Sequence, residues 1–473
     1  DRTGAVIFAP ALVADTWYHV GLTVRQDQSA ILKLVVKPSN ATTTLTGQVE
    51  LPLGMHDLSF TSTGGDGATG SWIIDNICMA GEVEADRRQY WPFDQVDTAT
   101  LRASSKKVYA YYYPVYTAGI SDDDPGLAWY TRTVRNPTAN TKPDRQCAGS
   151  ELLFRPLPHP PLASGLTTDE EFIQAAEKEI RLAIRLGVDG FLADFWQNPD
   201  PNNGQAYFHR KSFALLDAAQ RIDPDFKIIP AVYADGGASC TNGCADAYVD
   251  PLDYANSVKL QEILAHPSVL RLSDGRAMLS MWLSERFSPN WWSQVIAQCA
   301  ANGTPVALLP QFNSYGTLSD FAPISYAMAH WGPRTPRDFT WVEPVHDLGV
   351  KAVMPIVMQD VRTRGCHAYE AENSSTLRGI WGQGIEDGAD WAFLYSWSDF
   401  SEQAMQPATC IGFSAYDLNA YYLQWFKTGQ QPTIVRDTLY YFYRPYHTMV
   451  DQEFGNPWSV TSDNGTKDEV ELV

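Results

Sequence analysis

Two carboxyl side chains, Asp399 and Glu402, stand three residues apart just after an apolar run that ends at Trp397. Hydrolysis of a glycosidic bond uses one carboxylic acid to protonate the leaving oxygen and one carboxylate on the other side of the sugar. The aromatic residues around the pair suit a sugar-binding cleft. The same spacing is typical of a helix N-terminus, where negative charge complements the helix dipole. The elements around the pair must therefore decide between the two interpretations.

Eight short apolar runs predict β-strands, and most are separated by segments with helical periodicity. They cover residues 108–113, 190–195, 227–233, 277–282, 305–312, 326–331, 352–358 and 392–397. The clearest helix is expected to begin at Thr168, which forms a capping box with Glu171. This alternation predicts an α/β protein built on a (β/α)₈ TIM barrel. Catalytic groups of that fold lie at the C-terminal ends of the strands, which is where Asp399 follows the eighth strand.

Further side chains near the expected strand ends are candidates for binding a sugar. They are Tyr111, Tyr113, Asp194, Asp235, Gln311, Asn313, His330, Trp331 and Trp397. Asp194 would bind a sugar hydroxyl or tune the acidic pair, and the alternative is a carboxylate held by backbone amides or an arginine. Tyr111 and Tyr113 share one face of the first strand and would line a pocket or fill the barrel. His330 could equally be a core residue, Asp235 a turn residue, and Glu285 is expected to be a solvated loop residue.

The composition excludes some classes of partner. The 473 residues carry a net charge of -20, which argues against binding nucleic acid or an anionic membrane surface. No apolar stretch reaches the roughly 18 residues of a membrane span. The expected partner is a neutral or cationic polysaccharide, and 12% aromatic residues fit such a substrate. Two-carboxylate hydrolysis requires no metal or cofactor, and Asp122–Asp124 lacks the spacing of an EF-hand loop.

Cysteines and glycosylation sequons predict an oxidising compartment. Cys240 and Cys244 lie close together in a polar loop and, with Cys366 and Cys410, are candidates for disulfides, because the repeated CxxC spacing of a structural zinc site is missing. Candidate N-glycosylation sites are Asn40, Asn302, Asn373 and Asn464. The protein is therefore expected to be secreted to the extracellular space or cell wall, and the chain is expected to be a fragment of a longer protein.

Four regions are expected along the chain. Residues 1–90 alternate short β-type runs with turn residues, which predicts an antiparallel β-sandwich resembling laminin-G or lectin domains, either carbohydrate-binding or purely structural. Residues 91–106 are expected to form a linker, residues 107–430 the barrel, and residues 431–473 the start of a C-terminal β accessory domain.

Several segments, in order, resemble glycoside hydrolase family 71, whose members hydrolyse α-1,3-glucan. The most specific is residues 396–402 (SWSDFSE), which resembles the family element SWNDYGES. Residues 107–113, 187–191, 226–229, 274–277 and 426–429 resemble other parts of that barrel, so the likeness covers roughly residues 107–446. The related family 99 acts on α-mannosides and has two Glu at this spacing, so Asp399 favours family 71. Ser398 and Ser401 depart from the family's Asn and Gly.

The resemblance implies an inverting hydrolase of α-1,3-glucan in which Asp399 and Glu402 are the acid and base. Of the two, we expect Glu402 to be the acid and Asp399 the base. Inversion requires the two carboxyl groups to stand about 6.5–9.5 Å apart, so that a water molecule fits beneath the anomeric carbon. Two alternatives stay open at this point. One is a non-catalytic glycan-binding or cell-surface structural protein on the same barrel, which the altered Ser398 and Ser401 favour. The other is an α-mannoside hydrolase of the family 99 type.

Overall fold

The chain divides into two compact units, residues 1–74 and 75–473, which are described separately. The computed structural model describes residues 17–24, 29–37, 42–48, 88, 91–114, 168–197, 205–234, 244–332, 334–335, 339–362, 367–400, 402, 405–407, 412–443, 461–462, 464–465, 467 and 469–473.

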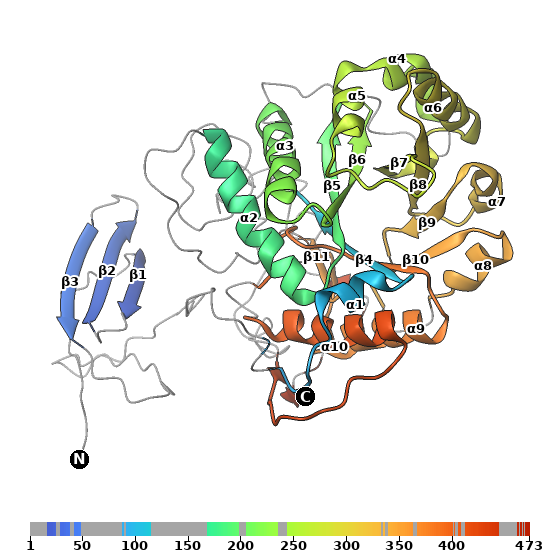
Figure 1. Cartoon of the computed structure of the whole chain (residues 1–473). Coiled ribbons are helices and arrows are strands. Elements are labelled where there is room, and N and C mark those ends of the chain that lie inside the picture. Colours follow the sequence, from blue (N-terminus) through green and yellow to red (C-terminus); the bar gives the residue numbers. More distant parts are fainter. Residues whose placement is uncertain are drawn as a thin grey trace. The chain divides into compact units, whose positions relative to one another are not determined.

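The described part of the first unit is a three-stranded antiparallel sheet. It consists of β1 (Trp17–Val24), β2 (Ser29–Lys37) and β3 (Thr42–Gln48), in the order β1-β2-β3 (Figure 1). These strands lie within residues 1–90, where the sequence predicts short β-type runs. The other strands expected in this region lie outside the described residues, so the β-sandwich stays a prediction.

The second unit contains a closed barrel of eight parallel strands, which confirms the barrel expected from the sequence (Figure 1). The strands are β4 (Lys107–Tyr112), β5 (Gly190–Trp196), β6 (Lys227–Tyr233), β7 (Ala277–Trp282), β8 (Val306–Phe312), β9 (Ala327–His330), β10 (Lys351–Ile356) and β13 (Trp391–Leu394). The ring closes where β13 pairs with both β10 and β4. Asp399 thus follows the last barrel strand, which is paired with the first.

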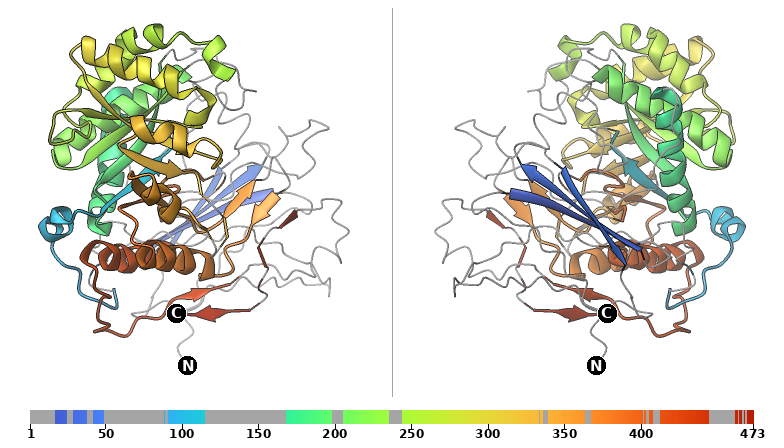
Figure 2. Two further views of the ribbon diagram at one scale, coloured as in Figure 1. Left: turned by 90° about the vertical axis from the view of Figure 1, so that its right-hand side faces the viewer. Right: turned by 90° about the vertical axis from the view of Figure 1, so that its left-hand side faces the viewer.

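Helices occupy the connections between these strands and form the outer layer of the barrel (Figures 1 and 2). They are α1 (Thr98–Ala103), α2 (Thr168–Leu186), α3 (Gln205–Ile222), α4 (Pro251–Asn256), α5 (Val258–Ala265), α6 (Pro289–Ala301), α7 (Leu318–Phe321), α8 (Val342–Asp347), α9 (Ser375–Glu386) and α10 (Ser414–Thr428), with short 3₁₀ turns at Cys244–Ala247, Ser284–Arg286 and Ala322–Ile324. The helix expected from Thr168 is confirmed as α2. Because both faces of the strands are covered, the strands read as apolar runs without polar alternation.

One glycine is required by the close approach of two barrel strands. A Cβ atom at Gly190, the first residue of β5, would lie 1.7 Å from the carbonyl oxygen of Lys227 on β6. No side chain fits at that distance, so Gly190 allows β5 and β6 to pair from their first residues, where Gly190 is opposite Lys227.

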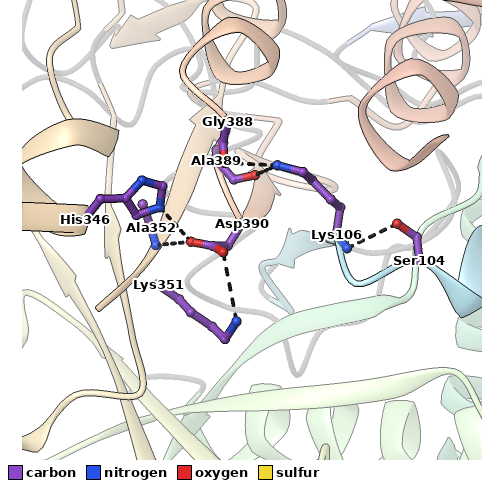
Figure 3. A network of polar contacts seen from close by, with 8 residues as sticks. All are labelled: Ser104, Lys106, His346, Lys351, Ala352, Gly388, Ala389 and Asp390. Atoms are coloured by element: carbon purple, nitrogen blue, oxygen red, sulfur yellow. Dashed lines mark hydrogen bonds and ion pairs between the residues drawn. The ribbon is translucent and has the colours of Figure 1, made fainter. Parts of the chain in front are cut away.

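A network of polar contacts closes the N-terminal end of the barrel (Figure 3). Asp390, just before β13, accepts a hydrogen bond from the backbone N of Ala352 (2.9 Å), and its carboxylate lies 2.8 Å from Nε2 of His346 and 3.9 Å from Nζ of Lys351. Lys106, just before β4, donates to the two backbone carbonyls that precede Asp390. These contacts join the starts of β10, β13 and β4.

A buried ion pair adds to this end of the barrel. Asp189, just before β5, accepts from the backbone N of Val108 (2.7 Å) and pairs with Nζ of Lys427 on α10 (2.7 Å). Lys427 also donates to the carbonyl oxygen of Gly187. Burial lowers the pKa of Lys427, while the charge of Asp189 opposes that effect.

The segment expected as a linker packs into the barrel unit instead. Trp91 and Phe93 are fully buried and stack on each other, and Nε1 of Trp91 donates to the carboxylate of Asp417 on α10 (2.8 Å). A linker carries few such contacts, because its residues are solvated. Its aromatic residues, rather than its proline and polar residues, determine where this segment lies.

The C-terminal segment also belongs to the barrel unit. The strands β14 (Tyr441–Phe442) and β16 (Glu471–Leu472) pair with each other beside the C-terminus (Figure 2). Strand β15 (Thr461–Ser462) joins β11 (Asp360–Arg362) and β12 (His367–Tyr369), which follow β10. The expected separate β domain is therefore not seen in the described residues.

Candidate functional site

The segment after β13 continues alongside the end of β4, and this contact positions Asp399. The backbone N of Trp397 donates to the carbonyl oxygen of Tyr111 (2.6 Å), and the N of Asp399 donates to Oγ of Ser396 (2.7 Å). Asp399 is only 6% exposed, and Glu402 is half-buried. The predicted acidic pair thus stands at the C-terminal end of the barrel.

Ser398 bonds to the backbone of Tyr113 with its hydroxyl. Its Oγ accepts from the N of Tyr113 and donates to the O of the same residue, each at 3.0 Å. One hydroxyl therefore extends the pairing of β13 and β4 by one step and fixes the residue next to Asp399. Ser398, which stands where family 71 has Asn, therefore has a structural role in this chain. Ser401 lies outside the described residues.

Asp194, on β5, places a third carboxyl group beside Asp399. Its Oδ2 accepts a hydrogen bond from the hydroxyl of Tyr111 (2.6 Å) and a longer one from the hydroxyl of Tyr233 (3.3 Å). Its Oδ1 is buried and has no hydrogen-bond partner in the part of the chain that the structure describes. The pKa of Asp194 is raised to about 8, mainly by burial and in smaller part by the negative charge of Asp399, against the opposing effect of the two hydroxyls. Asp194 therefore keeps its proton at neutral pH.

The two tyrosines stay protonated beside this carboxyl group. Burial first, and then the charge of Asp194, raise the pKa of Tyr111 and of Tyr233 well above its usual range. Both phenols remain hydrogen-bond donors throughout the range in which Asp194 titrates. The prediction that Tyr111 and Tyr113 share a face is confirmed by their stacked rings, 6.4 Å apart.

Trp331 joins this group across the top of the barrel. Its ring packs on Tyr111 (4.9 Å between centroids), on Tyr395 (4.7 Å) and on Trp282 at the end of β7 (5.7 Å). Gln311 lies in the barrel interior, where its amide accepts from the hydroxyl of Tyr395 and donates to a serine on β7. The oxygen and the nitrogen of the Gln311 amide are thus both hydrogen-bonded within the protein. Gln311 therefore belongs to the barrel interior and not to the surface of the site.

A second group of polar residues lies on the β7–β9 side of the same end. Glu285 is 5% exposed, so the expectation of a solvated loop residue is wrong: its Oε1 accepts from the backbone N of Asn313 (2.7 Å), and Oε2 has no partner. Burial raises the pKa of Glu285. The side chain of Asn313 is exposed at the rim.

His330 is held by its neighbours within this second group. Its Nδ1 accepts from the backbone N of Gly332 (2.8 Å), and its ring packs among Tyr315, Phe339 and Trp341. Burial, followed by the charge of a nearby arginine, lowers the pKa of His330 to about 4, so the ring is neutral at pH 7.

Trp397 lies in the packing layer and not on the surface of the site. Its side chain is fully buried and its ring packs on Phe191, an outward-facing residue of β5 (5.3 Å). A ring without exposed surface cannot stack on a sugar in this conformation, so the structure assigns Trp397 to anchoring the segment that carries Asp399. Asp235 lies outside the described residues.

The other predicted modification sites are only partly described. Cys240, Cys366 and Cys410 lie outside the described residues, as do Asn40 and the side chain of Cys244. Asn302 is exposed, as glycosylation requires, and Asn373 is half-buried. Asn464 is buried, and its amide nitrogen donates to the carbonyl oxygens of Arg334 and Glu370, so a glycan there would displace one of these bonds.

Searches for metal clusters and membrane helices cover the same described residues. Among them, no group of three or more His, Cys, Asp or Glu side chains could hold a metal ion. None of their helices is long and apolar enough to cross a membrane.

Some contacts at this end of the barrel were not predicted. Tyr233 was placed correctly on its strand but not recognised as a donor to Asp194. The signal was available, because Tyr233 ends β6 two residues beyond Ala231, which pairs with Asp194, and so lies on the same face. The buried ion pair of Arg334 with Asp360 (2.6 Å) joins the segments after β9 and β10 and has no sequence signal of its own.

Comparison with known proteins identifies the type of barrel. No protein-family model matches the sequence, and no curated protein matches it. Among solved structures, the endo-α-mannosidase of glycoside hydrolase family 99 from Bacteroides thetaiotaomicron aligns with 71% of this chain and 99% of its own, at 14% identity and a TM-score of 0.50. A second structure of that enzyme, with bis-tris-propane, has the same coverage and identity and a TM-score of 0.46. This likeness concerns the fold: the eight-stranded barrel of this chain is similar to that of the endo-α-mannosidase.

Proposed function

We propose that this chain is a glycoside hydrolase that cleaves α-glucosidic bonds of a polysaccharide, with α-1,3-glucan as its substrate. The observation that carries the proposal is the position of Asp399: it is nearly buried at the C-terminal end of a glycosidase-type barrel, and its charge acts on a second buried carboxyl group, that of Asp194. The resemblance of residues 396–402 to family 71 supports α-1,3-glucan as the substrate.

In the proposed mechanism Glu402 is the acid and Asp399 the base. Glu402 gives its proton to the glycosidic oxygen as the bond from that oxygen to the anomeric carbon breaks. Asp399 takes a proton from a water molecule, whose oxygen bonds to the anomeric carbon from the opposite face. The new hydroxyl is therefore β where the cleaved bond was α. No cofactor is needed for this reaction.

Hydrolysis of an α-mannoside is the second candidate. The observation that favours it is the fold similarity to an endo-α-mannosidase at a TM-score of 0.50. Asp at position 399, where family 99 has Glu, favours the α-glucan.

The test is incubation of the chain with α-1,3-glucan, other α-glucans and α-mannan, followed by measurement of new reducing ends. We expect release from α-1,3-glucan, with the product first seen as its β-anomer by proton NMR. Asp399→Asn and Glu402→Gln should each lower kcat by about 10²–10⁴-fold.

Matched controls are Asp274→Asn and Glu262→Gln, whose exposed carboxyl groups lie away from this end of the barrel. Both should retain full activity. Release from α-mannan alone would select the second candidate. Sugar release from no substrate, together with glycan binding that Asp399→Asn leaves unchanged, would instead support a non-catalytic glycan-binding protein.

A further inference from the structure

Tyr315 is an exposed aromatic residue in the connection that follows β8, at the same end of the barrel as Asp399. Its side chain is 45% exposed, whereas the residues of β8 are buried. Barrels of this type bind their substrates at the C-terminal ends of the strands, and flat aromatic faces suit sugar rings. Because single exposed apolar residues are common on protein surfaces, the surroundings of this ring must show whether it belongs to a site.

Three buried rings support Tyr315 from within the protein. Its ring packs on His330 (5.4 Å between centroids), Trp341 (5.6 Å) and Phe339 (6.2 Å). The supporting side chains are each at most 8% exposed, and Phe339 and Trp341 stack on each other. A side chain that is already held in place loses less conformational freedom when a ligand binds. Tyr315 is therefore an exposed ring in a fixed position.

Asn313 adds a polar group close to this ring. Its side chain is exposed two residues before Tyr315, and its backbone N donates to Oε1 of the buried Glu285 (2.7 Å). This bond ties the start of the connection after β8 to the turn after β7. The amide of Asn313 offers donors and an acceptor, and the phenol of Tyr315 keeps its hydrogen because burial raises its pKa to about 12. An aromatic face beside neutral polar groups suits a neutral sugar.

Tyr315 and Asp399 follow strands on different sides of the barrel mouth. Counting through β10 and β9, β8 is the third strand from β13, and neighbouring strands are spaced by roughly 4.8 Å. Aromatic contacts bridge the span, because Trp331 packs on Tyr111 of β4 and the preceding His330 packs on Tyr315. A single sugar ring is smaller than this span, so a ligand that contacts both Asp399 and Tyr315 must be an oligosaccharide.

We propose that Tyr315 and Asn313 form a subsite that binds a unit of the polysaccharide distant from the bond cleaved at Asp399. The inference rests on the proposed function and specifies the substrate as a chain of several neutral sugars. Tyr315 stacks on the face of one sugar ring, and Asn313 bonds to its hydroxyl groups. The subsite therefore strengthens binding only of chains long enough to reach it, and raises kcat/KM for those chains.

Calorimetric titration of the Asp399→Asn variant tests the subsite without turnover. The ligands are α-1,3-linked gluco-oligosaccharides and α-manno-oligosaccharides, from the disaccharide to the hexasaccharide. In this background, adding Tyr315→Ala should raise the Kd of the hexasaccharide about 3- to 10-fold and leave that of the shortest bound oligosaccharide unchanged. Tyr315→Phe, which keeps the ring, should raise it less than Tyr315→Ala.

Two further variants guard against an effect of misfolding. Asn313→Ala, which shortens an exposed side chain, should raise the Kd of the hexasaccharide roughly 2- to 10-fold. Tyr441→Ala is the matched control, because Tyr441 is an exposed tyrosine on β14, outside the connections that follow the barrel strands. It should leave the Kd unchanged.

The outcomes separate the subsite from the proposed function. If the wild type hydrolyses a glycan, an unchanged Kd and KM for long chains in Tyr315→Ala and Asn313→Ala would overturn the subsite and leave the hydrolase intact. Equal losses for short and long oligosaccharides would also overturn it. A chain that hydrolyses no glycan, but whose binding of the hexasaccharide depends on Tyr315, would contradict the proposed function and support the subsite. Absence of binding to every oligosaccharide would overturn both.

Discussion

Asp189 and Asp194 stand at opposite ends of β5, and their carboxyl groups have different partners. Asp189, at the N-terminal end, pairs with the ammonium group of Lys427 and accepts from a backbone N–H. Asp194, at the C-terminal end, has a pKa of about 8, and among the described residues it has no cation beside it and no hydrogen-bond partner for one oxygen. The same residue type, five positions apart along the chain, thus pairs with a cation at the start of β5 and keeps its proton at neutral pH near its end.

Other residues repeat this difference between the two ends. At the N-terminal end, Asp390 and Lys106 bond to backbone groups and side chains of neighbouring strands. At the C-terminal end, Glu285 and His330 are buried, and Oε2 of Glu285 has no partner among the described residues. Paired groups lower the free energy of the fold, while unpaired ones raise it unless a ligand completes their bonds. At these residues, the paired groups of the N-terminal end favour stability, and the unpaired groups of the C-terminal end fit the ligand binding proposed for that end.

Lys427→Met is expected to have the largest effect on stability. It leaves the carboxylate of Asp189 buried without its cation, which costs about 3–5 kcal/mol of the free energy of unfolding. Urea-induced unfolding measures this loss, and kcat at a temperature where the variant is folded should stay unchanged. Adding Asp189→Asn should recover part of the stability. A large fall in kcat of the folded variant would show that the two ends are not separate in function.

Asp194→Asn should change how stability depends on pH. The pKa of Asp194 is raised from 3.8 to about 8, so between these values the folded chain holds a proton that the unfolded chain has lost. Wild-type stability therefore contains a term that falls as the pH rises from about 4 to 8, and the variant lacks it. The free energy of unfolding of the variant minus that of the wild type should increase by roughly 2–5 kcal/mol across this window. A difference that does not vary with pH would contradict the protonated state.

Ser398→Ala should have the smallest effect. It removes both hydrogen bonds to the backbone of Tyr113 and should cost about 1–2 kcal/mol of the free energy of unfolding. Because the same bonds position Asp399, kcat should also fall, roughly 3- to 10-fold. Ser293→Ala on α6, which loses one hydrogen bond to a backbone carbonyl within its helix, is the control and should leave kcat unchanged. Equal kcat in the two variants would mean that Ser398 has no part in positioning the acid pair.

The barrel strands could be predicted because each is buried on both faces. The expected segments at 227–233 and 277–282 coincide with β6 and β7, and the other six differ only at their ends. A strand between two apolar layers reads as a short apolar run, and α2 reads as a period of 3.6, so chain order was enough to predict the barrel. The linker expected at 91–106 was wrong because the burial of Trp91 depends on α10, more than 300 residues later in the chain.

The site was predicted unevenly for a similar reason. Asp194, Tyr111 and Asp399 were found because they follow strand ends, which a barrel brings together. The surroundings of Glu285 and Trp397 were not, because a loop position does not reveal which backbone N–H or ring will cover a side chain. Glu285 is buried by its bond to Asn313 on the next strand, and Trp397 by its contact with Phe191.

The amino-acid sequence by itself determined the alternation of strands and helices, and with it the end of the barrel at which Asp399 and Asp194 stand. Local patterns of burial suffice for this, because parallel strands joined by helices all end on the same side. Only the tertiary structure decided that Asp189 has a cation and Asp194 has none. The electrostatic field at a carboxyl group and its solvation depend on residues from distant parts of the chain. For Asp189 this residue is Lys427, and for Asp194 the residues are Tyr111, Tyr233 and Asp399.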